Sequence, residues 1–170
     1  YKDGVVNRLH KGLAGLISGR GITVIEGEGR LTGPLTVTVG DEVHTGTDLV
    51  LASGSHSKSL PGLEIDGDKV ITSEHALALD RVPESVIVLG GGVIGCEFAS
   101  VWRSFGAEVT IVEALPRLVP AEDAASSKAL ERAFRKRGIK FRTGTPFETV
   151  TTTESGVSVT VAGGDTHAPG

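Results

Sequence analysis

The chain has 170 residues, of which 39% are hydrophobic and 22% charged, and its formal net charge is -4. This is the composition of a folded globular protein, and its acidic balance argues against nonspecific binding to nucleic acid or anionic membranes. A single cysteine excludes an internal disulfide, and the sequence holds neither an apolar run of about 18 residues nor a leading signal segment, so we expect a cytoplasmic protein.

The sequence contains no methionine and begins at Tyr1, inside a pattern that already reads as helical. We therefore expect the chain to be an interior piece of a longer protein. Such a piece can carry binding sites without carrying the groups that perform the chemistry.

The first part of the chain predicts one helix followed by short strands. Apolar residues recur at helical spacing over residues 5–17, and glycines then end the pattern. Turn signals rich in glycine separate predicted strands at 22–25, 35–39 and 48–52, as in an antiparallel meander. Residues 53–67 show no period, and Ser73 is a candidate N-cap for a short helix.

The pattern changes after Pro83. The apolar run at 86–89 is typical of a strand buried on both faces in a parallel sheet. A helical stripe over 94–105 leads to a second strand of this kind at 109–112, which completes a βαβ unit.

The rest of the chain predicts one more helix and three more strands. These are a helix at about 121–137, a strand at 139–142, and a hairpin of 147–152 with 157–161. The fold class is therefore α/β. We place a boundary that leaves residues 1–66 in one domain segment and residues 67–170 in a second domain.

A glycine motif, Gly90-Gly91-Gly92-Val93-Ile94-Gly95, follows the first buried strand and opens the next helix. In a G-x-G-x-x-G motif, Gly90 permits a tight turn, Gly92 lets the backbone approach a pyrophosphate, and Gly95 lets helix and strand pack closely. The amides and the positive dipole end of the helix favour an anion. The motif predicts a dinucleotide site.

An acidic residue stands where such a site needs one. Glu113 ends the second strand, at a distance from the motif where a carboxylate accepts hydrogen bonds from the adenosine ribose. A carboxylate there repels a 2′-phosphate, so NAD is predicted to bind in preference to NADP. Arg117 is close enough in sequence to leave open a contribution that favours NADP.

Further short motifs along the chain resemble those of one enzyme family. They are, in order, Gly27-Glu28-Gly29-Arg30, Gly33-Pro34, Ala52-Ser53-Gly54-Ser55, Leu60-Pro61-Gly62, Ser73 with Ala76-Leu77, the glycine motif with Glu97, Val101-Trp102, the run from Gly106 to Glu113, and Gly138-Ile139-Lys140-Phe141. Together they resemble dihydrolipoamide dehydrogenases, of the flavin-dependent pyridine nucleotide–disulfide oxidoreductase family. The resemblance covers nearly the whole chain.

The resemblance implies a fold and two cofactors. A Rossmann-like NAD-binding unit with a parallel sheet would follow a helix and an antiparallel meander that belong to an FAD-binding domain. FAD would contact Gly29, Ser53, Gly54 and Ser55, and Ser53 keeps the hydroxyl of the Thr that is usual in the family. NAD would contact Gly90, Gly91, Gly92, Val93, Ile94, Gly95, Cys96, Glu97, Glu113 and Phe147. Glu97 would point toward the nicotinamide end; the alternative is that it merely stabilises the first turn of its helix.

The resemblance also implies parts that the 170 residues do not contain: an earlier glycine motif for FAD, a Cys-x4-Cys redox pair, and a His-Glu couple. We interpret the Cys96 thiol as a small packing group and not as a redox centre. No catalytic residue is therefore assigned within this chain.

Other candidate sites are weaker. The five histidines show no spacing typical of a metal site, and the basic residues from Arg132 to Arg137 read as a solvated helix end, not as a nucleic-acid patch. No serine stands in a nucleophile elbow.

Three functions remain open from the sequence. The first is part of an enzyme that oxidises dihydrolipoamide, free or on a lipoyl domain, with NAD+ through FAD and a disulfide. The second is another flavin reductase, such as a mercuric reductase. The third is a noncatalytic dinucleotide-binding module. The resemblance implies a homodimeric parent and membership of a 2-oxo acid dehydrogenase complex.

Overall fold

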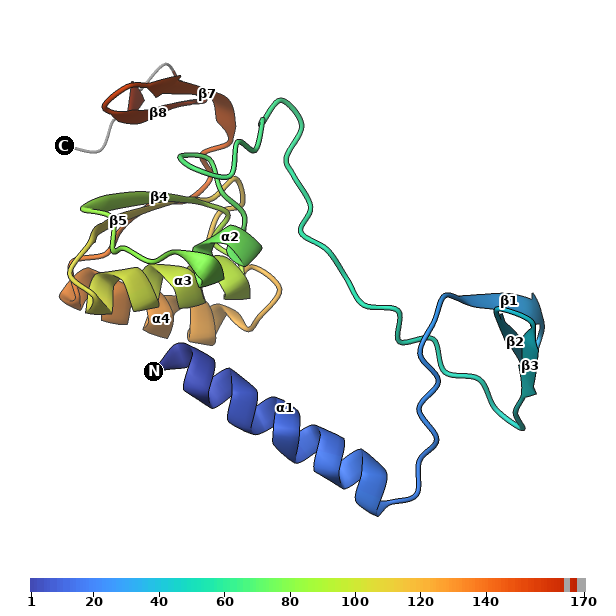
Figure 1. Cartoon of the computed structure of the whole chain (residues 1–170). Coiled ribbons are helices and arrows are strands. Elements are labelled where there is room, and N and C mark those ends of the chain that lie inside the picture. The colour runs from blue at the N-terminus through green and yellow to red at the C-terminus, as the bar shows by residue number, and fades with distance from the viewer. Residues whose placement is uncertain (164–165, 168–170) are drawn as a thin grey trace. The chain divides into compact units, whose positions relative to one another are not determined.

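The computed structural model describes residues 1–163 and 166–167, and the chain divides into two units, Tyr1–Gly54 and Ser55–Gly170 (Figure 1). The division follows Gly54, whereas the sequence places the domain boundary after residue 66. The segment 55–66 therefore groups with the second unit.

The first unit begins with helix α1 (Lys2–Gly19), which confirms the predicted helix and extends it at both ends. Its apolar residues, spaced by three or four positions, lie on one face. None of its residues is buried, and Leu9, Leu13 and Leu16 are among its exposed side chains.

A three-stranded antiparallel meander follows, made of β1 (Gly29–Gly33), β2 (Thr36–Val39) and β3 (Glu42–Thr45). The meander and its middle strand confirm the sequence prediction. The strands predicted at 22–25 and 48–52 are wrong, because these residues pair with no strand among those described. Val50 and Leu51 are exposed there, so an apolar, β-branched composition is not enough to make a strand without a partner.

The second unit is built on a parallel sheet of order β4-β5-β6, with β4 at Ser85–Leu89, β5 at Glu108–Val112 and β6 at Lys140–Arg142. Helices α3 (Val93–Ser104) and α4 (Ala124–Lys136) connect these strands, which confirms the predicted βαβ unit and the strand and helix that follow it. Helix α4 begins three residues later than expected, after Asp123.

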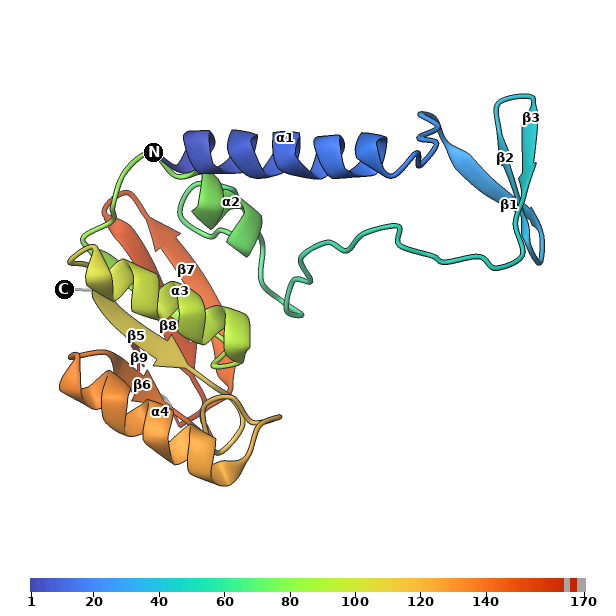
Figure 2. The same ribbon diagram turned by 90° about the horizontal axis from the view of Figure 1, so that it is seen from below.

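A third layer consists of the antiparallel strands β7 (Phe147–Thr153), β8 (Gly156–Val161) and β9 (Thr166–His167). The hairpin β7–β8 is confirmed, and β9 is an addition that the sequence did not indicate. Figure 1 shows α3 and α4 on one side of the parallel sheet and the hairpin on the other, and Figure 2 gives a second view of the same layers.

Two separate cores explain why β4 and β5 carry apolar residues on both faces. Val109 and Ile111 of β5 belong to the core that contains α3 and α4. Val112 belongs to the other core, with Val159 and Val161 of β8. Because successive side chains of a strand point to opposite faces, a strand covered on both faces needs apolar residues at consecutive positions.

A short helix, α2 (Ser73–Ala78), precedes β4. The sequence proposed Ser73 as its N-cap, which is wrong by one position: Thr72 precedes the helix, and its N–H donates to Nδ1 of His75 at 3.2 Å. Ser73 instead lies with its hydroxyl 3.2 Å from that of Ser57.

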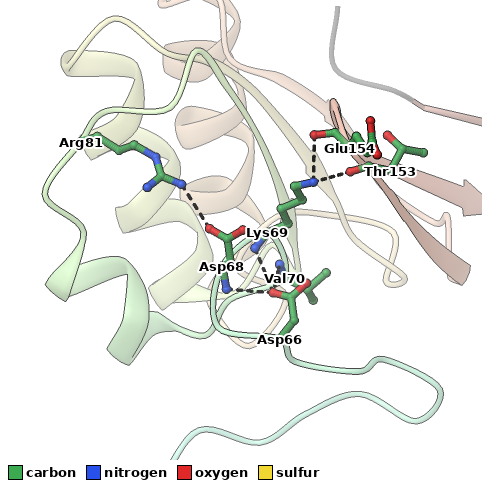
Figure 3. A network of polar contacts seen from close by, with 7 residues as sticks. All are labelled: Asp66, Asp68, Lys69, Val70, Arg81, Thr153 and Glu154. Atoms are coloured by element: carbon green, nitrogen blue, oxygen red, sulfur yellow. Dashed lines mark hydrogen bonds and ion pairs between the residues drawn. The ribbon is translucent and has the colours of Figure 1, made fainter.

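The segment before α2 is tied to the hairpin by a polar network (Figure 3). The Asp66 carboxylate accepts N–H hydrogen bonds from Val70, Asp68 and Lys69, and these donors lower the pKa of the Asp66 carboxyl. The turn presents the Lys69 ammonium to the carbonyl oxygens of Thr153 and Glu154, the latter at 3.0 Å. Residues more than 80 positions apart are thereby joined.

In residues 1–163 and 166–167, no helix has both the length and the apolarity that crossing a membrane requires.

Candidate functional site

The glycine motif lies between the end of β4 and the start of α3. Gly90 has φ of +108°, a conformation that side chains rarely adopt, and its N–H donates to the carbonyl of Val112 at 2.8 Å. A Cβ at Gly95 would overlap the carbonyl oxygen of Gly90, so this glycine is required by the contact between helix and strand. Both positions behave as the motif predicts.

Gly92 is different, because a Cβ built there meets nothing within 4 Å. The protein itself therefore gives no packing reason for a glycine at this position. Gly92 precedes the first helical residue, Val93, and makes no side-chain cap, and the first turn of α3 contains no acidic residue. The leading N–H groups of a helix need partners from outside the helix.

The start of α3 has the features that a dinucleotide requires. The helix begins with uncapped amides, a positive dipole end and an open space over Gly92, which together suit a pyrophosphate. Val93 and Ile94, at the same helix start, are exposed. The residues present fit the diphosphate of NAD.

Glu113 lies directly after β5 and is only 7% exposed. One carboxylate oxygen, Oε2, accepts the N–H of Gly91 at 2.5 Å, and the other, Oε1, accepts the N–H of Leu115 at 2.7 Å. An ionised carboxylate has about four acceptor positions, so about two remain for ribose hydroxyl groups. The sequence predicted that the motif and the acid act together, and the structure brings them into direct contact.

Gly91 is fixed on its other side as well. Its carbonyl oxygen accepts the N–H of Val119 at 2.7 Å and the thiol of Cys96 at 3.3 Å. A Cβ on Gly91 would lie 2.6 Å from Cδ2 of Leu118 and 3.1 Å from Cβ of Glu113. Sequence reasoning missed Leu118 and Val119, because they show no periodicity and lie in a loop that holds other apolar residues.

Cys96 lies in α3, and its side chain is buried in the core. Burial raises the pKa of its thiol to about 11, and the nearby Glu113 carboxylate acts in the same direction. A thiol with this pKa is protonated near neutral pH and is a poor nucleophile. This agrees with the interpretation of its side chain as a packing group.

Arg117 lies half-buried in the loop between β5 and α4. Its Nη2 donates to the carbonyl oxygen of Pro120 at 2.8 Å and to that of Glu122 at 3.1 Å. Nη2 is thus occupied within its own loop, while Nε is buried and has no hydrogen-bond partner. These contacts do not support the NADP-favouring role that the sequence left open.

The other candidates for NAD contact have different surroundings. Glu97 is exposed on α3, but it is the fifth helical residue, so the alternative that it stabilises the first turn is wrong. Phe147 begins β7 and packs, half-buried, against the core of Val112, Val159 and Val161.

The candidates for FAD contact fall in or next to the first unit. Gly29 begins β1, where it pairs with Val39. Ser53, Gly54 and Ser55 lie exposed in a stretch with no helix or strand, and Gly54 has φ of +86°.

Two weaker possibilities find no support in the described part of the chain. No group of three or more potential ligands from His, Cys, Asp and Glu is close enough to hold a metal ion. In the basic cluster, Arg135 stacks 4.6 Å from the centre of the Phe141 ring, and Arg137 donates to the Ser100 carbonyl at 2.9 Å.

Comparison with known proteins identifies one family. Residues 3–168 match the model of a family described as pyridine nucleotide-disulphide oxidoreductase. A leghemoglobin reductase of Vigna unguiculata is 40% identical over an alignment of 172 positions, which covers 96% of this chain and 33% of that protein. A dihydrolipoyl dehydrogenase of Chlorobaculum tepidum is 44% identical over 153 residues, which cover 87% of this chain and 33% of that protein.

Among solved structures, LpdA of Mycobacterium tuberculosis superposes with a TM-score of 0.81 at 28% identity, covering 96% of this chain and 38% of that one. The chain therefore spans about a third of the length of the curated relatives that it matches.

Proposed function

Because the chain belongs to the pyridine nucleotide-disulphide oxidoreductase family, whose members are FAD- and NAD(H)-dependent oxidoreductases, we propose that its second unit binds NAD. The observation that carries the proposal is the buried Glu113 carboxylate, hydrogen-bonded to Gly91 beside the open start of α3. The amides from Gly92 to Gly95 bind the diphosphate, and Glu113 accepts hydrogen bonds from the adenosine ribose.

The remaining contacts of NAD follow the resemblance. The exposed carboxylate of Glu97 lies toward the nicotinamide end, and Phe147 lies beside the adenine. The backbone of Cys96 belongs to the same helix start, while its thiol stays in the core. Gly29, Ser53 and Gly54 of the first unit contact FAD, together with Ser55, the next residue in the chain.

The activity we propose for the parent protein is the oxidation of dihydrolipoamide to lipoamide with NAD+. When bound, FAD and a redox disulfide outside these residues supply the electron transfer, and NAD+ accepts a hydride. This chain contributes binding and orientation: the amides of α3 fix the diphosphate, and Glu113 fixes the ribose. The relative from Chlorobaculum tepidum, a dihydrolipoyl dehydrogenase at 44% identity, supports this assignment.

A second candidate keeps the two cofactors and changes the electron acceptor. The leghemoglobin reductase of Vigna unguiculata, 40% identical, favours it because that name implies a different acceptor from lipoamide. Nothing in the NAD site distinguishes the two, since the acceptor would meet the disulfide and not these residues.

The resemblance further suggests a cytoplasmic homodimer that joins a 2-oxo acid dehydrogenase complex through a lipoyl domain. The 170 residues contain one cysteine, so we expect the isolated chain to bind nucleotide without lipoamide turnover. A fluorescence titration with NADH, run beside a lipoamide turnover assay, tests both statements. Lipoamide turnover by the isolated chain would refute the second, and an absence of NADH binding would refute the first.

A further inference from the structure

Arg117 closes a turn in the loop between β5 and α4. Its Nη2 donates to two carbonyl oxygens of the same loop, those of Pro120 and Glu122. The N–H of Glu122 in turn donates to the carbonyl of Val119 at 2.9 Å. Three contacts therefore hold residues 117–122 in one shape.

That shape includes an unfavourable residue. Val119 has φ of +43°, and among the described residues it is the one non-glycine residue with a positive φ. A β-branched residue adopts this conformation only where its surroundings impose it. Such residues gather at functional sites, so the contacts made by Val119 show what the loop is holding in place.

Val119 uses its N–H to bind the carbonyl oxygen of Gly91 at 2.7 Å. Leu118, its neighbour, is completely buried and lies against the same glycine. The N–H of Gly91 meanwhile donates to Glu113. The Gly91 backbone thus connects the Arg117 loop on one side with the ribose-binding carboxylate on the other.

We propose that Arg117 is a positioning residue for NAD, which holds the 117–122 loop so that Val119 and Leu118 fix Gly91 and, through it, Glu113 and the start of α3. This rests on the proposed NAD site. In this proposal, the Arg117 side chain binds carbonyl oxygens of its own loop and does not bind the 2′-phosphate of NADP.

The first experiment measures the affinity of the full 170-residue chain for NADH and NADPH after Arg117→Ala and Arg117→Lys. Arg117→Ala should weaken both nucleotides about 10-fold and leave their affinity ratio unchanged. Lysine keeps a charged donor but lacks the planar guanidinium group whose Nη2 reaches both carbonyls, so it should restore part of the loss, leaving a defect of about 3-fold. Arg132→Ala, which removes the same charge from an exposed position on α4, should change neither affinity.

Two outcomes of this titration would overturn the proposal. A loss confined to NADPH would show that Arg117 reads a phosphate, and unchanged affinities in both variants would show that the loop does not position the site. If Arg117→Ala does not unfold cooperatively, Arg117→Lys tests the proposal instead. A loss of about 3-fold in affinity for both nucleotides would support it, and unchanged affinities would refute it.

The second experiment needs no nucleotide. Hydrogen exchange of the Val119 and Gly91 amides should become about 10-fold faster in Arg117→Ala, while that of Ile111 in the central strand should not change. Should wild-type protein bind neither nucleotide, the proposed function fails, and this exchange still decides whether Arg117 holds the loop. Equal exchange rates at Val119 and Gly91 in Arg117→Ala and wild type would refute the proposal that Arg117 holds the loop.

Discussion

The backbone N–H of Gly91 donates to Oε2 of Glu113 at 2.5 Å, joining residues that stand 22 positions apart. One residue belongs to the turn that would carry a diphosphate and the other to the strand end that would bind a ribose. Because both partners are protein groups, this contact links the two halves of the proposed NAD site to each other.

Glu113→Ala should weaken NADH binding by about 10- to 100-fold, since hydrogen bonds to a charged group contribute about 1.5–3 kcal/mol. NADPH should lose less, because the same change removes a charge that repels its 2′-phosphate. The ratio of the two affinities, measured by fluorescence titration, should therefore fall. Using the ratio corrects for any general loosening, because Glu113 also accepts two backbone N–H groups. A ratio that stays constant would contradict the assigned role.

Gly92→Ala should separate binding from stability. A Cβ at this position meets no protein atom within 4 Å, so the free energy of unfolding should change by less than about 1 kcal/mol. The methyl group would occupy the space assigned to the diphosphate, and NADH affinity should fall at least about 10-fold.

Gly95→Ala is the matched control for that variant. Here the added Cβ would overlap the carbonyl oxygen of Gly90. The free energy of unfolding should therefore fall by about 1–3 kcal/mol or more, and the thermal unfolding midpoint should fall with it. If Gly92→Ala instead destabilised the protein as much as Gly95→Ala, the space over Gly92 would be filled by the protein itself.

The Cys96 thiol should make stability depend on alkaline pH. Burial raises its pKa from 9.0 to about 11, so the folded state favours the protonated form more than the unfolded state does. This contribution is fully present below about pH 9 and is lost as the pH rises toward 11. The loss is on the order of 2–3 kcal/mol at 1.36 kcal/mol per pKa unit. Denaturant unfolding across that range measures it, and Cys96→Ala should flatten the curve; an equal slope in the variant would assign the effect elsewhere.

Lys69→Ala should loosen the hairpin locally. Its ammonium group ties the turn held by Asp66 to the Thr153 and Glu154 carbonyls (Figure 3), an exposed contact that contributes about 0.5–1.5 kcal/mol. Amide exchange at 153–157 should accelerate, with little change in the global unfolding midpoint. Lys128→Ala, on the exposed face of α4, is the control and should leave exchange at 153–157 unaltered. Identical exchange in the two variants would show that Lys69 does not stabilise the turn.

The second unit could be predicted from the sequence because its signals are local or lie at a fixed spacing. The apolar runs of β4 and β5 reflect burial on both faces, and the distance from the glycine motif to Glu113 is set by one helix and one strand. The glycines themselves indicate where the chain must turn or pack closely.

The parts that could not be predicted depend on partners remote in the sequence. Residues 22–25 and 48–52 have strand-like composition, yet strands form only where another strand pairs with them. The position of Val119 against Gly91 is determined by how a loop folds back onto the sheet, and no spacing rule describes that loop. The engagement of Arg117 with Pro120 and Glu122 follows from the same fold.

NAD binding by the second unit can be tested by a comparative titration of the wild-type chain with NADH and NADPH, followed by nucleotide fluorescence. We expect saturable binding of NADH and clearly weaker binding of NADPH. Equal affinities, or no binding of NADH by protein that is folded by circular dichroism, would contradict the proposed NAD site.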